Sequence, residues 1–197
     1  MTSKKYCASL TGNPFLFFET RVTAKLLLGG IVKKEILADI IQSNLFQYKN
    51  TKSIPKRFNA IYKRISALDS SLLETLADGS LEEAKIINLL AVARSDRLFR
   101  EFIAETINDP LNRYKKNLTR LDFERFFKFK RETIPEVQKW SDQTIQRLIQ
   151  VYIQMLVQSG FLDNRKNKTI QRFLTSHEFK EILERSFHPE LVRIITV

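Results

Sequence analysis

The amino-acid sequence predicts a mainly helical, all-α protein, and three observations favour that class. The 197 residues include only five glycines and five prolines, so few tight turns are available for a sheet of many strands. Apolar residues recur at three- and four-residue spacing along most of the chain, which is the period of a helix packed on one side. Residues typical of helix N-caps, such as Ser80, Thr119 and Ser141, precede several of these runs.

The first helix is predicted from the stretch SLTGNPFLFFET, residues 9–20. Asn13 and Pro14 are typical of an N-cap and a first helical position, and the glycine pair at 29–30 would end the helix. At helical spacing, one apolar face would contain Phe15, Phe18, Val22 and Leu26. We therefore expect this stretch to begin the hydrophobic core and to contact no ligand.

The rest of the first half is also predicted to be helical. The expected helices cover residues 32–42, 54–68, 69–78, 80–93 and 96–107. The stretch NDPLNRYKKN, residues 108–117, combines an Asp-Pro turn with a run of charges, which favours a domain boundary there. We therefore divide the chain into an N-terminal region, 1–111, with a helix-turn-helix-like array, and a C-terminal region, 112–197. The two regions can also pack as one body.

The C-terminal region has the order of elements of a winged helix. One helix begins with the capping pair Thr119 and Asp122, a short turn follows, and Ser141 caps a long helix that Gly160 ends. After Gly160, two short apolar runs flank a polar, basic tip. This pattern predicts a small β-hairpin near residues 161–173, here called the wing.

The net charge of +11 is distributed unevenly along the chain. Residues 1–79 contain 12 Lys and Arg against 6 Asp and Glu, residues 80–111 contain 4 against 6, and residues 112–197 contain 17 against 10. Two basic ends around a slightly acidic middle favour two surfaces that face a polyanion such as nucleic acid. Contact with a ribosome or a membrane surface would give the same signal.

The chain lacks the residue patterns of common catalytic, metal and cofactor sites. His177 and His188 have no partner at metal-ligand spacing, and Cys7 alone can form neither an internal disulfide nor a CxxC metal site. There is no glycine-rich phosphate loop and no apolar run long enough to span a bilayer. We therefore expect a non-enzymatic, cytoplasmic protein with no metal, no cofactor, no small-molecule substrate and no membrane partner.

The predicted helix 54–68 separates apolar residues from basic ones. Its basic face consists of Lys56, Arg57, Lys63 and Arg64. Two helices joined by a glycine-containing turn precede it, so it fits the third position of a helix-turn-helix array. Its Lys and Arg side chains would then reach phosphates and guanine edges in a major groove. A solvated basic face on any globular protein would give the same pattern.

The predicted helix 142–158 carries a more specific feature, a polar stripe with few charges. This glutamine stripe consists of Gln143, Gln146, Arg147, Gln150 and Gln154, at positions i, i+3, i+4, i+7 and i+11. Glutamine can pair with adenine edges and arginine with guanine. The tip of the wing would add the cations Arg165, Lys166 and Lys168. A neutral face toward solvent, or a face that meets another protein, are the alternatives.

The helix after Thr119 is rich in phenylalanine. Its aromatic residues Phe123, Phe126, Phe127 and Phe129 alternate with Arg125, Lys128, Lys130 and Arg131. Stacking of single-stranded bases on these rings is one hypothesis. Aromatic residues at helical spacing favour a core position instead, with charged side chains extending past them to solvent.

Four stretches of the sequence together resemble one family. They are LTGNPFLFFETR, NLFQYKNTKSIPKRFNAIYKRISALD, AKIINLLAVARSDRLFREF and KWSDQTIQRLIQVYIQMLVQSGFL. In this order, from about Tyr6 to Leu162, they resemble the BrxA family, small core proteins of bacterial BREX (bacteriophage exclusion) systems. The resemblance implies an all-helical, non-enzymatic protein with helix-turn-helix elements that binds DNA. It also implies work within a system that methylates host DNA and blocks replication of unmodified phage DNA.

The residues and the resemblance together predict a DNA-binding accessory protein of phage defence. Its partners would be double-stranded DNA and other BREX components, namely a methyltransferase, an alkaline-phosphatase-like protein and an ATPase. One alternative is an adaptor that scaffolds those components, with only incidental nucleic-acid contact. Another is a protein that binds RNA or single strands through the phenylalanine-rich helix.

Overall fold

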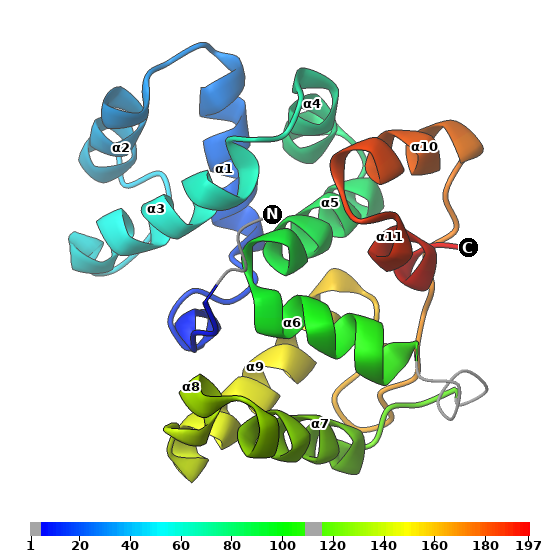
Figure 1. The fold of residues 1–197 in the computed structure, drawn as a ribbon. Coiled ribbons are helices and arrows are strands. Elements are labelled where there is room, and N and C mark those ends of the chain that lie inside the picture. Colours follow the sequence, from blue (N-terminus) through cyan, green and yellow to red (C-terminus); the bar gives the residue numbers. More distant parts are fainter. Residues whose placement is uncertain (1–4, 109–115) are drawn as a thin grey trace.

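The computed structural model describes residues 5–108 and 116–197, and these residues form an all-α fold, as predicted (Figure 1). The α-helices are α1 (Phe17–Leu28), α2 (Lys33–Gln42), α3 (Ile54–Ile65), α4 (Ser70–Asp78), α5 (Leu81–Ser95), α6 (Arg97–Phe102), α7 (Arg120–Thr133), α8 (Pro135–Gln138), α9 (Asp142–Ser159), α10 (His177–Ser186) and α11 (Pro189–Ile195). Two 3-10 turns, η1 (Ser9–Thr11) and η2 (Thr51–Ser53), precede α1 and α3. A π-helical turn, η3 (Ile103–Ile107), continues α6.

Helix α5 lies at the centre of the fold, with α1, α3, α4, α6, α9 and α11 in contact with it (Figure 1). Its side chains from Ile86 to Ala93 are all buried. A helix that is buried on every side is typical of the middle of a core. The predicted cap is confirmed, because the backbone N–H of Glu83 donates to the Ser80 hydroxyl at 3.2 Å.

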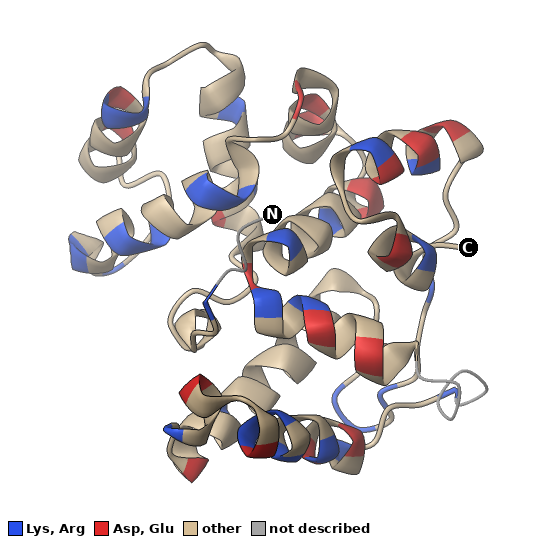
Figure 2. Cartoon of the chain, in the orientation of Figure 1, with Lys and Arg blue, Asp and Glu red and all other residues tan. Residues whose placement is uncertain are grey.

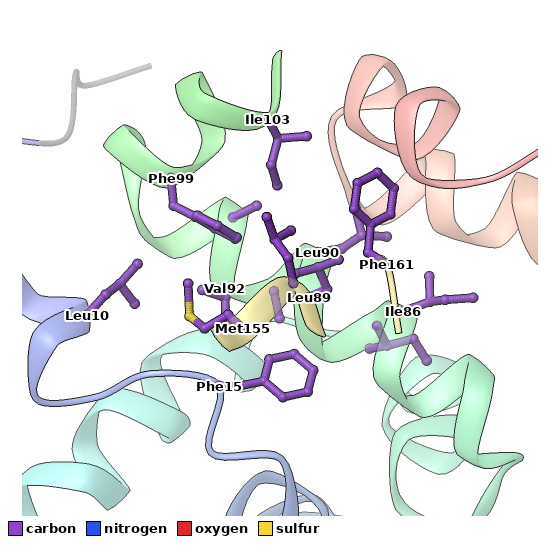
Figure 3. Packing of buried hydrophobic residues seen from close by; sticks show 14 of the residues in the cluster. Leu10, Phe15, Ile86, Leu89, Leu90, Val92, Phe99, Ile103, Met155 and Phe161 are labelled. Atoms are coloured by element: carbon purple, nitrogen blue, oxygen red, sulfur yellow. The ribbon is translucent and has the colours of Figure 1, made fainter. Parts of the chain in front are cut away.

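Among the described residues, one cluster of buried apolar side chains extends through both predicted regions. Figure 3 shows Phe15 before α1, Leu90 of α5, Phe99 of α6 and Met155 of α9 gathered in this cluster. The boundary predicted between residues 111 and 112 lies outside the described residues. The division into two regions therefore stays a prediction.

The start of the first helix differs from the prediction. Helix α1 begins at Phe17, and its N-cap residue is Leu16, whose φ of 46° lies in the left-handed region. Asn13 and Pro14, the predicted cap and first position, belong to an irregular segment before the helix. Their carbonyl groups accept hydrogen bonds from a side chain of α3, described below, and this tertiary contact prevails over their local preference for a helix start.

The predicted apolar face of α1 is correct for Val22 and Leu26, which are half-buried against the core, but not for Phe18. Phe15 lies before the helix and is buried, whereas Phe18 is 47% exposed. The side chains of α1 that are buried are Thr20, Thr23 and Ala24. Helix α1 uses these small residues to pack against α3, α4 and α5, so Phe18 is left on the surface.

The phenylalanine-rich helix, α7, belongs to the core, as its spacing favours. Phe123, Phe126 and Phe127 are buried. The ring of Phe102 in α6 lies 4.8 Å from that of Phe123 and 5.2 Å from that of Phe126, between centroids. Only Phe129 of the four is exposed. Single-strand stacking through this helix would therefore depend on one ring.

The wing does not form the two strands that were predicted. Residues 161–173 turn back on themselves, but they are joined by an isolated bridge between Leu162 and Ile170. Two backbone hydrogen bonds flank this bridge, from the N–H of Asp163 to the carbonyl of Thr169 and from the N–H of Gln171 to the carbonyl of Phe161. The carboxylate of Asp163 also accepts the backbone N–H groups of Asn164 and Thr169. Local Asp and Asn bonds of this kind compete with a regular ladder, which explains why no hairpin extends from the tip.

A half-buried ionic cluster links Tyr6, α6, η3 and α7. Lys130 is buried, and its Nζ lies 2.6 Å from Oε2 of Glu101 and 2.7 Å from Oε1 of Glu105. Arg97 and the hydroxyl of Tyr6 also donate to Glu101. Burial by itself raises the pKa of Glu101, but the hydrogen bonds from Lys130, Arg97 and Tyr6 outweigh it, and the pKa is lowered from 4.5.

We expect this cluster to make stability depend on pH in acid. The folded pKa of Glu101 lies below its unfolded value, so its contribution is present above about pH 4.5 and is lost as the pH falls through the folded pKa. Glu101→Gln should therefore flatten the loss of unfolding free energy below pH 4.5, measured by urea denaturation at several pH values. Glu190→Gln, on the exposed side of α11, controls for the lost charge. An unchanged acid profile in Glu101→Gln would contradict this assignment.

Candidate nucleic-acid interface

The basic face of α3 follows from the spacing of its apolar residues. Ile54, Phe58, Ile61 and Ile65 are buried and fix one side of the helix. Figure 2 shows only basic and uncharged residues along α3, in contrast to the mixed charges of α7 and α10. Of the basic face, Lys56 and Lys63 are exposed. The fold therefore presents two ammonium groups from this helix to solvent.

Arg64 does not belong to the exposed surface, which corrects the prediction for this residue. Its side chain is 3% exposed, and its guanidinium donates to the carbonyl oxygens of Pro14, at 2.7 Å, and Asn13. Burial lowers the pKa of Arg64 to about 10, partly offset by the charge of Asp96. Arg64 thus fastens the segment before α1 to α3 and is unavailable to a phosphate.

Arg57 is half-buried against an aromatic ring. Its guanidinium carbon lies 4.7 Å from the ring centroid of Tyr48, a cation–π geometry. The hydroxyl of Tyr48 donates to Glu19 of α1. Burial and the bond to Glu19 raise the pKa of Tyr48 to about 12, so the phenol keeps its proton near neutral pH. Arg57 therefore holds the loop before α3 in place while exposing part of its charge.

The glutamine stripe lies on the outer side of α9. Ser141 caps this helix, as predicted, and the opposite side is buried through Ile145, Leu148 and Tyr152. Gln143, Gln146, Arg147 and Gln150 are exposed, and Gln154 is half-buried. Sequence reasoning missed Gln158, although it continues the same spacing one turn after Gln154 and is exposed.

Two hollows lie along the glutamine stripe, beside the N-terminal segment (residues 9–19). The first, of about 530 Å³, is lined by Thr11, Gln143, Thr144, Gln146, Arg147 and Gln150. The second, of about 410 Å³, is lined by Pro14, Phe15, Leu16, Phe17, Phe18, Glu19, Gln154 and Gln158. The stretch expected only to begin the core therefore also forms one wall of both hollows.

The N-terminal segment also connects α3 to the glutamine stripe. A Cβ atom placed on Gly12 would lie 3.6 Å from Nζ of Lys56, so that ammonium group lies directly beside the segment. The preceding residue, Thr11, lines the first hollow together with Arg147. Lys56 and the glutamine stripe are thus brought to neighbouring places on the surface, although they come from different halves of the chain.

Helix α7 borders the other side of the stripe. Arg120 donates through Nη2 to Oε1 of Gln146 at 2.5 Å, and through Nε to Oε1 of Glu124 at 2.7 Å. A third, smaller hollow of about 190 Å³ lies between α7 and α9 and is lined in part by Lys128 and Gln146. Arg120 was missed from the sequence because its partner is 26 residues away, and no local spacing indicates such a pair.

The three cations of the wing differ in position: Lys168 bonds within the turn, whereas Arg165 and Lys166 are exposed. Lys168 has a φ of 54°, and its Nζ donates to the backbone carbonyls of Arg165, at 3.1 Å, and Lys166, at 3.0 Å. The ammonium group of Lys168 is thereby engaged within the turn. The side chains of Arg165 and Lys166 are exposed at the tip. The backbone N–H of Leu118 donates to the carbonyl of Lys168, so the wing lies beside the start of α7.

Residues 5–108 and 116–197 contain no group of three or more His, Cys, Asp or Glu side chains arranged to hold a metal ion. Over the same residues, no helix has both the length and the apolar character that a membrane crossing requires.

The chain is similar to proteins of one family. A family model for BrxA matches residues 4–186. A BREX protein BrxA from Bacillus cereus (strain H3081.97) is 33% identical over 178 residues, covering 89% of this chain and 88% of that protein. A BREX protein BrxA from Escherichia coli O9:H4 (strain HS) is 23% identical over 192 residues, covering 98% and 90%.

A solved structure shares the fold. The crystal structure of an uncharacterized protein from Magnetospirillum magneticum superposes with a TM-score of 0.81 at 22% sequence identity, covering 98% of this chain and 99% of that one. At that identity the likeness concerns the fold alone. The family model, by contrast, spans most of the sequence, and so does the Bacillus cereus relative. This chain therefore belongs to the BrxA family of BREX proteins.

Proposed function

We propose that this protein is a non-enzymatic, cytoplasmic, DNA-binding accessory protein of a BREX phage-defence system. One observation carries the proposal: Lys56 of the basic face lies beside Gly12, and the adjacent Thr11 lines the first hollow together with the glutamine stripe. A cation beside a row of amide side chains suits a phosphate backbone next to base edges. Double-stranded DNA is the proposed ligand.

Each part of the surface has a distinct role in this proposal. Lys56, Lys63 and Arg147 neutralise phosphates, which supplies most of the affinity. The glutamines of α9 face base edges, as the second helix of a helix-turn-helix element does in a major groove. Arg165 and Lys166 extend from the wing to the flanking backbone. The basic charge also raises the rate of encounter with a polyanion.

We expect duplex binding to weaken steeply with salt. If on the order of six phosphates are neutralised, the slope of log K against log salt should be about −5. Fluorescence anisotropy with a labelled duplex, titrated over a range of salt, measures this slope. Single-stranded DNA and RNA of the same sequence serve as competitors in the same assay. Binding that does not respond to salt, or no binding at low salt, would contradict the proposal.

An adaptor role is the second candidate, and the second hollow favours it. Phe18 is 47% exposed there, beside Gln154 and Gln158. An aromatic ring at the edge of a hollow is a common anchor point for another protein. If this role dominates, the methyltransferase, phosphatase-like protein or ATPase should co-purify with the chain after nuclease treatment. Phe18→Ser should then release that partner and leave duplex affinity unchanged.

A further inference from the structure

The carbonyl oxygens of two stripe glutamines are already in use within the protein. Oε1 of Gln146 accepts from Nη2 of Arg120 at 2.5 Å, and Oε1 of Gln150 accepts from Nη1 of Arg147 at the longer distance of 3.5 Å. Arg120 also donates through Nε to Glu124, and this second bond orients the guanidinium so that Nη2 faces Gln146. The stripe is therefore not a row of freely turning amides.

The chemistry of arginine fixes which way these amides point. A guanidinium has five N–H donors and no acceptor, so a glutamine beside it must turn its oxygen, rather than its nitrogen, toward it. The Nε2 amino groups of Gln146 and Gln150 are then the atoms left for a ligand. Arg147 adds further donors between them. The centre of the stripe thus offers hydrogen-bond donors and has few acceptors to offer.

A donor surface distinguishes the bases in a major groove. Guanine presents two acceptors there, N7 and O6, whereas adenine presents N7 and the donor amino group at N6. The usual pairing of glutamine with adenine needs the amide oxygen to accept from N6, and in Gln146 the bond from Arg120 takes one of the two lone pairs of that oxygen and turns the oxygen toward Arg120. An adenine amino group opposite the outward Nε2 of this residue would face another donor, which costs affinity.

We propose that the glutamine stripe selects guanine over adenine, and that Arg120 is the residue that sets this selectivity by positioning Gln146. The inference rests on the proposed function, because it needs duplex DNA at the stripe. It differs from the usual pairing of glutamine with adenine that the residue type suggests. Phosphate oxygens are also acceptors, so the same donors can contact the backbone without any base preference.

The test compares duplexes that differ only in purine type. At one fixed salt concentration, wild-type protein should bind a duplex with guanine runs about five-fold or more tightly than one with adenine runs. Replacing adenine by 2-aminopurine, which still pairs with thymine but has no amino group at C6, removes the unpaired donor and should remove most of that difference. Equal affinity for all three duplexes, or tighter binding of the adenine duplex, would overturn the proposal.

Variants separate positioning from charge. Arg120→Met frees Oε1 of Gln146, so the guanine preference should fall below about two-fold. Arg125→Met removes the same charge from an exposed site on the same helix and should weaken both duplexes alike, keeping their ratio. Gln146→Glu keeps an acceptor for Arg120 but removes the outward donors, so it should also abolish the preference. If Arg120→Met and Arg125→Met leave the same ratio, Arg120 does not set selectivity.

The proposed function and this inference fail in different ways. Absence of salt-dependent binding to every duplex would remove both. Salt-dependent binding without guanine preference would leave the protein a DNA binder and refute the selectivity alone. Circular dichroism of each variant confirms that the helices are retained, and Arg120 is well placed for substitution because its side chain is 61% exposed.

Discussion

Replacing Arg64 by methionine should lower the free energy of unfolding by about 3 kcal/mol. The guanidinium satisfies the buried carbonyl groups of Asn13 and Pro14, and methionine can donate to neither. Each carbonyl left unpaired costs about 1–3 kcal/mol, and relief of the buried charge returns part of that sum. Methionine keeps much of the apolar length of the side chain, so the effect reports hydrogen bonding more than a cavity.

Lys63→Met is the matched control for this prediction. Lys63 is the preceding residue of the same helix, carries the same charge and is exposed. Its replacement should leave the midpoint of urea denaturation nearly unchanged and weaken duplex binding. Arg64→Met should do the reverse at a temperature where it stays folded. Equal stability of the two variants would show that the segment before α1 does not depend on Arg64.

The contrast between Lys63 and Arg64 shows where sequence reasoning ends. Helical spacing places both residues on the basic face, and nothing local separates them. Arg64 becomes buried because the segment around Pro14 crosses α3 at that residue, 50 positions away along the chain. Which of two neighbouring cations is covered is decided by such a long-range crossing, which periodicity cannot supply.

The long amphipathic helices were more predictable. In α9 the apolar residues Ile145, Leu148 and Tyr152 are buried while Gln146 and Gln150 are exposed, as their spacing indicates. Caps at Ser80 and Ser141 were also correct, because their bonds reach only three residues along the chain. These caps form within one turn, and no other part of the chain is needed to form them.

Local signals failed where tertiary contacts compete with them. Asn13 and Pro14 have the residue types of a helix start, yet their carbonyls bind Arg64 and the helix begins at Phe17. The wing shows the same limit in a shorter span. Its apolar runs suggested strands, but the side-chain oxygens of Asp163 and Asn164 accept backbone N–H groups and close the turn within a few residues. Strands would need a longer ladder than this segment provides.

Replacing Lys56, Lys63 and Arg147 together by glutamine should weaken duplex binding about 500-fold at about 0.1 M salt. Each phosphate contact contributes about 0.9 to the salt slope, which is about 0.9 logarithmic units of affinity at that concentration. Loss of all three should also make the slope shallower by about 2.7. All three side chains are exposed, so the change should leave the unfolding free energy nearly the same.

The single changes within this set test whether α3 and α9 act on one duplex. Lys56 belongs to the first half of the chain and Arg147 to the second, but Gly12 and Thr11 bring them to one surface. If both residues contact the same duplex, Lys56→Gln and Arg147→Gln should each lower the affinity about eight-fold at about 0.1 M salt, and the double variant should multiply the two losses.

If the helices bind separate duplexes instead, each single variant keeps the affinity of the untouched surface. Only the double variant would then lose binding, and a labelled duplex would saturate at two per chain. The shape of the titration therefore decides between a continuous surface and two independent ones, even when the total loss is the same.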